Sequence, residues 1–66
     1  MSVLADALIA RIKAEPSHFS ELADRHRDVP WPDFLRAWGQ VRGLPELKRD
    51  EDGHYLFAEA NPPANE

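Results

Sequence analysis

Proline residues divide this chain into short segments, and this division constrains the fold more than any other feature of the sequence. Pro16 ends the first apolar segment, because the residue before a proline is driven out of the helical region. Pro30 and Pro32 cannot both lie inside a helix, so they mark a turn, although Pro32 fits the first turn of a helix that follows. Pro45 closes the next segment. A chain of 66 residues interrupted in this way can form only short elements.

The segment before the first of these prolines has a helical pattern. Leu4, Leu8 and Ile12 recur at four-residue steps, which predicts an amphipathic helix from Val3 to Ala14. Its expected N-cap is Ser2, whose side-chain oxygen can accept a hydrogen bond from the first turn.

The segment between Pro16 and Pro30 is predicted to hold a short link and a second helix. Phe19 lies in the link and is expected to point inward. Ser20 is the expected N-cap of a helix from Glu21 to about Arg27.

The third helix has the clearest pattern after that of the first. Its predicted apolar stripe comprises Phe34, Leu35, Trp38 and Val41. Asp33 lies near the positive end of the helix dipole, and Gly43 is the expected C-terminal cap. The strength of the stripe makes this helix and the first one the firmest elements of the predicted fold.

The last part of the chain is predicted to form a hairpin from Glu46 to Ala58. Asp52 and Gly53 form a turn dipeptide of the kind that closes tight hairpins. The strand after this turn places Tyr55 and Phe57 on one face. Residues 59–66 are rich in proline, asparagine and alanine, which predicts a disordered tail.

The order of these elements resembles the winged helix-turn-helix superfamily. The start of the second helix in bacterial regulators is similar to the segment Phe19-Ser-Glu-Leu-Ala-Asp-Arg. A recognition helix is similar to the segment Phe34-Leu-Arg-Ala-Trp-Gly-Gln-Val-Arg-Gly-Leu. Leu47-Lys-Arg-Asp-Glu-Asp-Gly-His-Tyr-Leu-Phe is similar to a wing. The resemblance implies a mainly helical α+β fold, with residues 1–58 as one winged-helix domain and a two-stranded C-terminal wing.

The predicted core draws on all of these elements. Its helical members are expected to be Leu4, Leu8, Ile12, Phe19, Leu22, Leu35, Trp38 and Val41. The hairpin is expected to close the open side with Leu47, Tyr55 and Phe57, because a hairpin alone is only marginally stable in water.

Charge is distributed unevenly along the chain, whose formal net charge is −4. Residues 25–49 hold six basic and three acidic residues, whereas residues 50–66 hold five acidic residues and no basic one. In winged-helix DNA binders the third helix enters the major groove, so the resemblance implies that its polar face, Asp33, Arg36, Ala37 and Gln40, meets the bases. Arg36 can pair with a guanine edge and Gln40 with an adenine edge. The expected phosphate contacts are Arg25, Arg27, Arg42, Lys48 and Arg49.

These residues predict a small DNA-binding regulator, with a protein-interaction module as the alternative. Asp50, Glu51 and Asp52 at the wing tip, and Asp33 at the start of the third helix, would repel a phosphate backbone. A free-standing nucleic-acid binder is usually basic. Lys48 and Arg49 also suit an edge strand that avoids aggregation. The overall acidity therefore keeps a protein partner open.

Trp31, between two prolines, has two possible roles. It is either an interaction hot spot or a satellite core residue that fastens the turn. A monomer of this size makes few contacts with DNA, so the chain is expected to dimerise or to join a larger complex, through the first helix or Trp31.

Several other classes of function have little support. The chain has no cysteine, no glycine-rich phosphate loop and no paired carboxylates in an apolar setting, so neither catalysis nor a cofactor is expected. His18, His26 and His54 are too dispersed to predict a metal site, and a chain this small is not expected to enclose a ligand pocket. The absence of a signal peptide or a long apolar run predicts a cytoplasmic protein without membrane contact.

Overall fold

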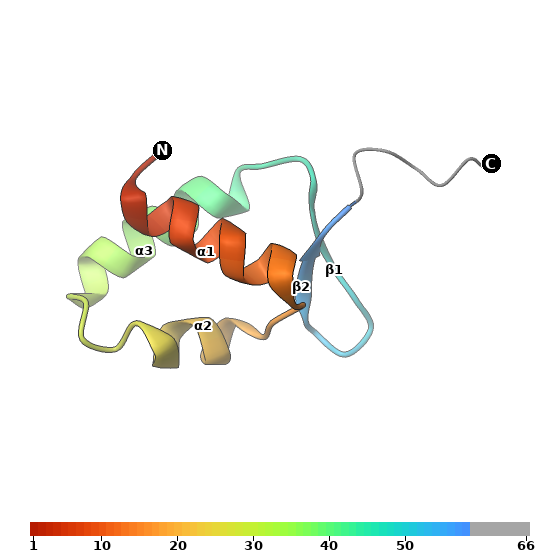
Figure 1. The fold of residues 1–66 in the computed structure, drawn as a ribbon, viewed down its shortest axis with the longest axis horizontal. Helices are drawn as coiled ribbons and strands as arrows, with labels where there is room; N and C mark the ends of the chain where they lie inside the picture. Colours follow the sequence, from red (N-terminus) through yellow and green to blue (C-terminus); the bar gives the residue numbers. More distant parts are fainter. Residues whose placement is uncertain (59–66) are drawn as a thin grey trace.

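Three helices precede a two-stranded antiparallel hairpin (Figure 1). The computed structural model describes residues 1–58, and the predicted tail lies outside this range. The elements are α1 (Val3–Ala14), α2 (Phe19–Arg25), α3 (Trp31–Arg42), β1 (Leu47–Arg49) and β2 (Tyr55–Phe57). Helix α1 packs on α3 and on β2, so the hairpin lies at one end of the helical layer. This mainly helical α+β architecture confirms the predicted fold class and is compatible with a winged-helix layout.

Helix α1 has the predicted bounds and cap. The Ser2 hydroxyl accepts a hydrogen bond from the Ala5 backbone N–H at 3.0 Å, which satisfies a donor that the first turn leaves free. The helix buries Ala5, Leu8 and Ile12, and it ends ahead of Pro16 as the proline requires. The residue pattern was therefore sufficient to predict this element.

Helix α2 begins earlier than predicted, and Ser20 is not its N-cap. The N-cap is His18, whose backbone N–H donates to the Glu21 carboxylate at 2.8 Å. Because Glu21 is three residues from the cap, its side chain can reach back and satisfy this donor. The helix therefore begins at Phe19 and ends at Arg25, two residues before the predicted end.

Helix α3 buries three of the four residues of its predicted stripe, with Ala37 in place of Leu35. Its buried side chains are Phe34, Ala37, Trp38 and Val41. Leu35 is 43% exposed and is not a core residue, whereas Ala37 is only 3% exposed and cannot meet a DNA base. The buried positions follow the spacing i, i+3, i+4, i+7 of one helix face, and Leu35 lies outside that face. Gly43 is the C-cap, as predicted.

The hairpin is joined to the helices by backbone hydrogen bonds. Leu47 pairs with Phe57 and Arg49 with Tyr55, and Gly53 takes a φ of 88° in the turn, a region that favours glycine. Ser17, in the link before α2, forms a bridge with Tyr55 through two hydrogen bonds of 3.0 and 2.7 Å. The link therefore acts as a third, very short strand beside β2.

The core lies between the helices and the hairpin. Its buried apolar residues are Ala5, Leu8, Ile12, Leu22, Phe34, Ala37, Trp38 and Val41. The predicted core residues Leu4, Phe19, Leu47, Tyr55 and Phe57 are partly buried and pack against this cluster. Trp38 meets Tyr55 edge-on, with ring centroids 5.0 Å apart, so an aromatic contact fixes the hairpin on α3.

Candidate functional site

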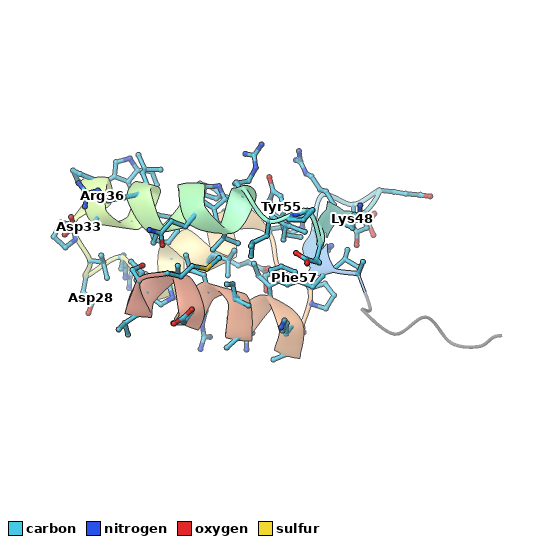
Figure 2. All side chains as sticks on the ribbon, turned by 90° about the horizontal axis from the view of Figure 1, so that it is seen from above. Asp28, Asp33, Arg36, Lys48, Tyr55 and Phe57 are labelled. Carbon is cyan, nitrogen blue, oxygen red and sulfur yellow. The ribbon has the colours of Figure 1, made fainter. Side chains whose placement is uncertain are left out.

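Two of the predicted DNA contacts are paired with acidic side chains. Arg36 is paired with Asp33 at 3.1 Å, one turn earlier on α3, and Arg27 is paired with Asp24 at 3.5 Å. Figure 2 shows Arg36 and Lys48 at opposite ends of the molecule. A phosphate backbone or a base edge that approached these arginines would meet an aspartate as well.

Gln40, the second predicted base reader, is held by a neighbouring element. Its Oε1 atom accepts a hydrogen bond from the Ser2 backbone N–H at 3.1 Å. Bidentate reading of adenine uses both the oxygen and the nitrogen of the amide. The side chain would have to leave the start of α1 before it could read a base.

The remaining predicted phosphate contacts come from three different elements. Arg25, Arg42 and Lys48 form no ion pair within residues 1–58, and they lie at the end of α2, at the end of α3 and on β1. The Arg49 guanidinium lies over the Tyr55 ring, 5.5 Å from its centroid, which is cation–π geometry.

The acidic tip of the hairpin is a turn organised by Asp50. Its Oδ1 atom accepts hydrogen bonds from the backbone N–H groups of Asp52 at 2.9 Å and of His54 at 2.8 Å. The hydrogen bond from the His54 backbone is the main cause that lowers the pKa of the Asp50 carboxyl below its usual value. Asp50 therefore has a structural role in closing the hairpin.

Protonation of Asp50 gives a measurable pH effect. Because its pKa is lower in the folded chain, the carboxylate stabilises the fold fully above the unfolded-state pKa, and this contribution is lost as the pH falls through the folded-state pKa. We expect the amide proton shifts of Asp52 and His54 to titrate together, with a midpoint below the ordinary aspartate pKa of about 3.9. Both titrations should disappear in Asp50→Asn. A midpoint at or above the ordinary value would contradict this role.

Two histidines that are 36 positions apart in the chain meet beside this turn. The His18 and His54 ring centroids are 3.9 Å apart, so these two residues are not dispersed as the sequence suggested. Asp50, Asp52 and His54 also offer ligand atoms within 4.8 Å of one another, a set of donors able to hold a cation. The hydrogen bonds of Asp50 account for its position without an ion.

An outer row of residues on α3 stands apart from the basic positions. We call Trp31, Leu35, Gly39 and Arg42 the outer row, because their spacing of four, four and three residues aligns them along one side of the helix. Trp31 is 52% exposed and Leu35 is 43% exposed. In the described chain, no atom outside the adjoining backbone lies within 4 Å of the place that a Cβ of Gly39 would take. The row therefore presents two large apolar side chains, an open position and a cation.

Trp31 is held in place although half of it is exposed. Its ring stacks on Phe34 with centroids 5.4 Å apart and an interplanar angle of 11°, and it meets Phe19 edge-on at 6.3 Å. One side of Trp31 therefore fastens the start of α3, and the other side faces solvent.

A groove on another side of the molecule lies between α1 and the hairpin. Its volume is about 660 Å³, and its lining includes Ile9, Ile12, Leu44, Leu56 and Phe57. A volume of this order falls within the range of small-molecule pockets, but the groove is partly open and not enclosed. The lining is largely aliphatic, with a charged side chain at Lys13 and another at Glu46.

The comparisons with known proteins assign no family. The sequence matches no protein-family model, and no curated protein or solved structure is significantly similar to it. Among residues 1–58, no helix has both the length and the apolar character needed to cross a membrane.

Proposed function

We propose that this chain is a winged-helix module that docks on a protein through the outer row of α3. The observation that carries the proposal is the pair of exposed apolar side chains, Trp31 and Leu35, on this helix. In winged-helix DNA binders the third helix enters the major groove. An exposed tryptophan and leucine on it fit a protein surface better than a polar groove.

The seating of Trp31 supports the proposal. Tryptophan and arginine are enriched among the residues that dominate protein interfaces. Because Phe34 and Phe19 already hold the Trp31 ring, binding would cost little conformational entropy. Arg42, at the other end of the row, adds a charged contact that can orient a partner.

The electrostatics also favour a protein over DNA. The net charge of −4 gives no general attraction for a polyanion, and Asp33 accompanies Arg36 at the start of α3. DNA binding remains the second candidate because Arg25, Arg42 and Lys48 form no ion pair within the described chain.

Site-specific photocrosslinking tests the proposal. Leu35 is replaced by benzoylphenylalanine in the full chain, which is irradiated in extract from its native cells. We expect a crosslinked adduct that protease degrades. An excess of unlabelled wild-type chain should prevent its formation by competition, whereas an excess of the Trp31→Ala variant should not. The matched control carries the same label in place of Val3, which is 87% exposed and lies on α1.

Three results would contradict protein docking: an adduct that only nuclease removes, equal adducts from both labelled positions, or no adduct.

A titration of the nitrogen-15-labelled chain with mixed-sequence duplex DNA tests the second candidate function, DNA binding. Salt-sensitive shifts of the Arg42 and Lys48 amides at low ionic strength would favour DNA. Unchanged amides at low salt would exclude general DNA binding.

A further inference from the structure

We infer that the partner of the outer row is a second copy of this chain, with α3 packed antiparallel on α3 about a two-fold axis. The inference rests on the proposed function, because it assigns the occupant of the same surface. It requires the outer row to be complementary to itself, since a two-fold interface uses the same surface on both copies.

The spacing of the outer row meets this requirement. If the axis passes midway along the helix between Leu35 and Gly39, antiparallel packing places each Leu35 opposite Gly39 of the second copy. Residues 35 and 39 are separated by about 6 Å along a helix axis, and residues 31 and 42 lie close to one turn beyond them on either side. The same operation therefore brings each Trp31 close to Arg42 of the second copy.

The shapes at the centre of this arrangement are complementary. Leu35 is a large apolar side chain that projects from the monomer, with 43% of its surface exposed. Gly39 has no side chain, and its position is open to solvent in the described structure. Small residues let two helices approach closely, and a leucine can fill the space that the glycine of the facing helix leaves. Two such contacts form at once by symmetry.

The ends of the row are complementary as well, because a cation at one end faces an aromatic ring at the other. Arg42 forms no ion pair with any described acidic side chain, so its guanidinium is available. Phe34 covers one face of Trp31, and the exposed part of the indole can receive a cation. Arg36 and Asp33 neutralise each other beside the row, so they add little repulsion between copies that each carry −4.

Association also relieves a weakness of the monomer. A chain of 66 residues buries a smaller fraction of its surface on folding than a larger domain does, and α3 leaves two of its large apolar side chains exposed. Binding to the folded chain alone would shift the folding equilibrium toward the native state. Self-association would therefore make thermal stability depend on protein concentration.

Sedimentation equilibrium of the full chain, from low micromolar to near-millimolar concentration, tests the inference. We expect wild type to dimerise, and Leu35→Glu and Gly39→Leu each to raise the dissociation constant by at least about tenfold, or about 1.4 kcal/mol. Val3→Glu is the matched control, because it makes the same kind of change at an exposed position of α1 and should leave the dissociation constant unchanged.

The Gly39→Leu variant shows whether a loss of dimerisation could instead be caused by misfolding of the monomer. A Cβ at this position lies in open space, and leucine favours a helix more than glycine does. This variant should therefore melt at or above the monomeric wild-type temperature while it dimerises poorly. A dimer that persists in both variants would place the interface elsewhere and overturn the inference.

The two proposals fail in different ways. A wild-type chain that stays monomeric while position 35 crosslinks to a different protein would overturn self-association and leave protein docking intact. A monomeric chain that gives no adduct would overturn both. An adduct of two chains, lost on competition with wild type, would support both.

Discussion

Replacement of Phe34 by alanine is expected to remove a large share of the free energy that stabilises the fold. Phe34 is 1% exposed and lies in the core between α3 and its neighbours. Removal of a buried phenylalanine costs about 3–5 kcal/mol. A domain of this size has a total stability of roughly 3–10 kcal/mol. Urea unfolding followed by circular dichroism at low micromolar concentration measures the loss.

The neighbouring residue supplies the control for this experiment. Leu35→Ala removes a side chain of similar volume from an exposed position, so its effect on the monomer should stay near 0.5 kcal/mol or below, roughly the range of surface substitutions. The helical stripe read from the sequence placed Leu35 in the core. Equal destabilisation by the two substitutions would support that reading and contradict the structure.

Leu22→Ala is expected to be the second most damaging of these substitutions. Leu22 is the buried residue of α2 and is fully shielded from solvent, so this short helix depends on it for its attachment to the core. A leucine-to-alanine change at such a position costs about 2–5 kcal/mol. Thermal unfolding followed by circular dichroism, with hydrogen exchange of the α2 amides, reports both global and local loss.

Ser20→Ala is the control on the same helix. Ser20 lies exposed in the first turn, and the cap is His18, so the substitution should change stability by no more than about 0.5 kcal/mol. If Ser20 were the cap, its removal would cost roughly 1 kcal/mol. A loss of that size would show that the helix begins where the sequence placed it.

Local patterns predicted the elements because each depended on neighbours in the chain. The four-residue steps of α1 and the Ser2 cap involve residues within one turn, and the Gly53 turn needs only its own backbone conformation. The start of α2 was missed because only Ser20 was considered as the cap, whereas the Glu21 side chain accepts a hydrogen bond from the His18 backbone.

The buried face of α3 could not be read from periodicity alone. Phe34 and Leu35 are adjacent and both apolar, so either can begin a stripe that includes Trp38. The position of α1 against α3 selects the stripe that contains Ala37. An alanine gives a weak apolar signal, and the sequence therefore assigned it to the polar face.

The contacts at the candidate site differ in how far they could be foreseen. The Asp33–Arg36 pair spans three residues of one helix, so helical spacing could have revealed it. The Ser2–Gln40 hydrogen bond joins residues 38 positions apart, and the His18–His54 contact joins residues 36 apart. Such pairs arise only from tertiary packing, which is why the sequence overestimated how many side chains remain available for DNA.

The bridge between Ser17 and Tyr55 means that the two strands of the hairpin are anchored unequally. Strand β1 pairs with β2 alone, whereas β2 also pairs with the segment that joins α1 to α2. Because Ser17 is almost fully buried, this join lies inside the molecule rather than at its edge. Strand β1 can therefore separate from β2 while β2 stays bound to the helical unit.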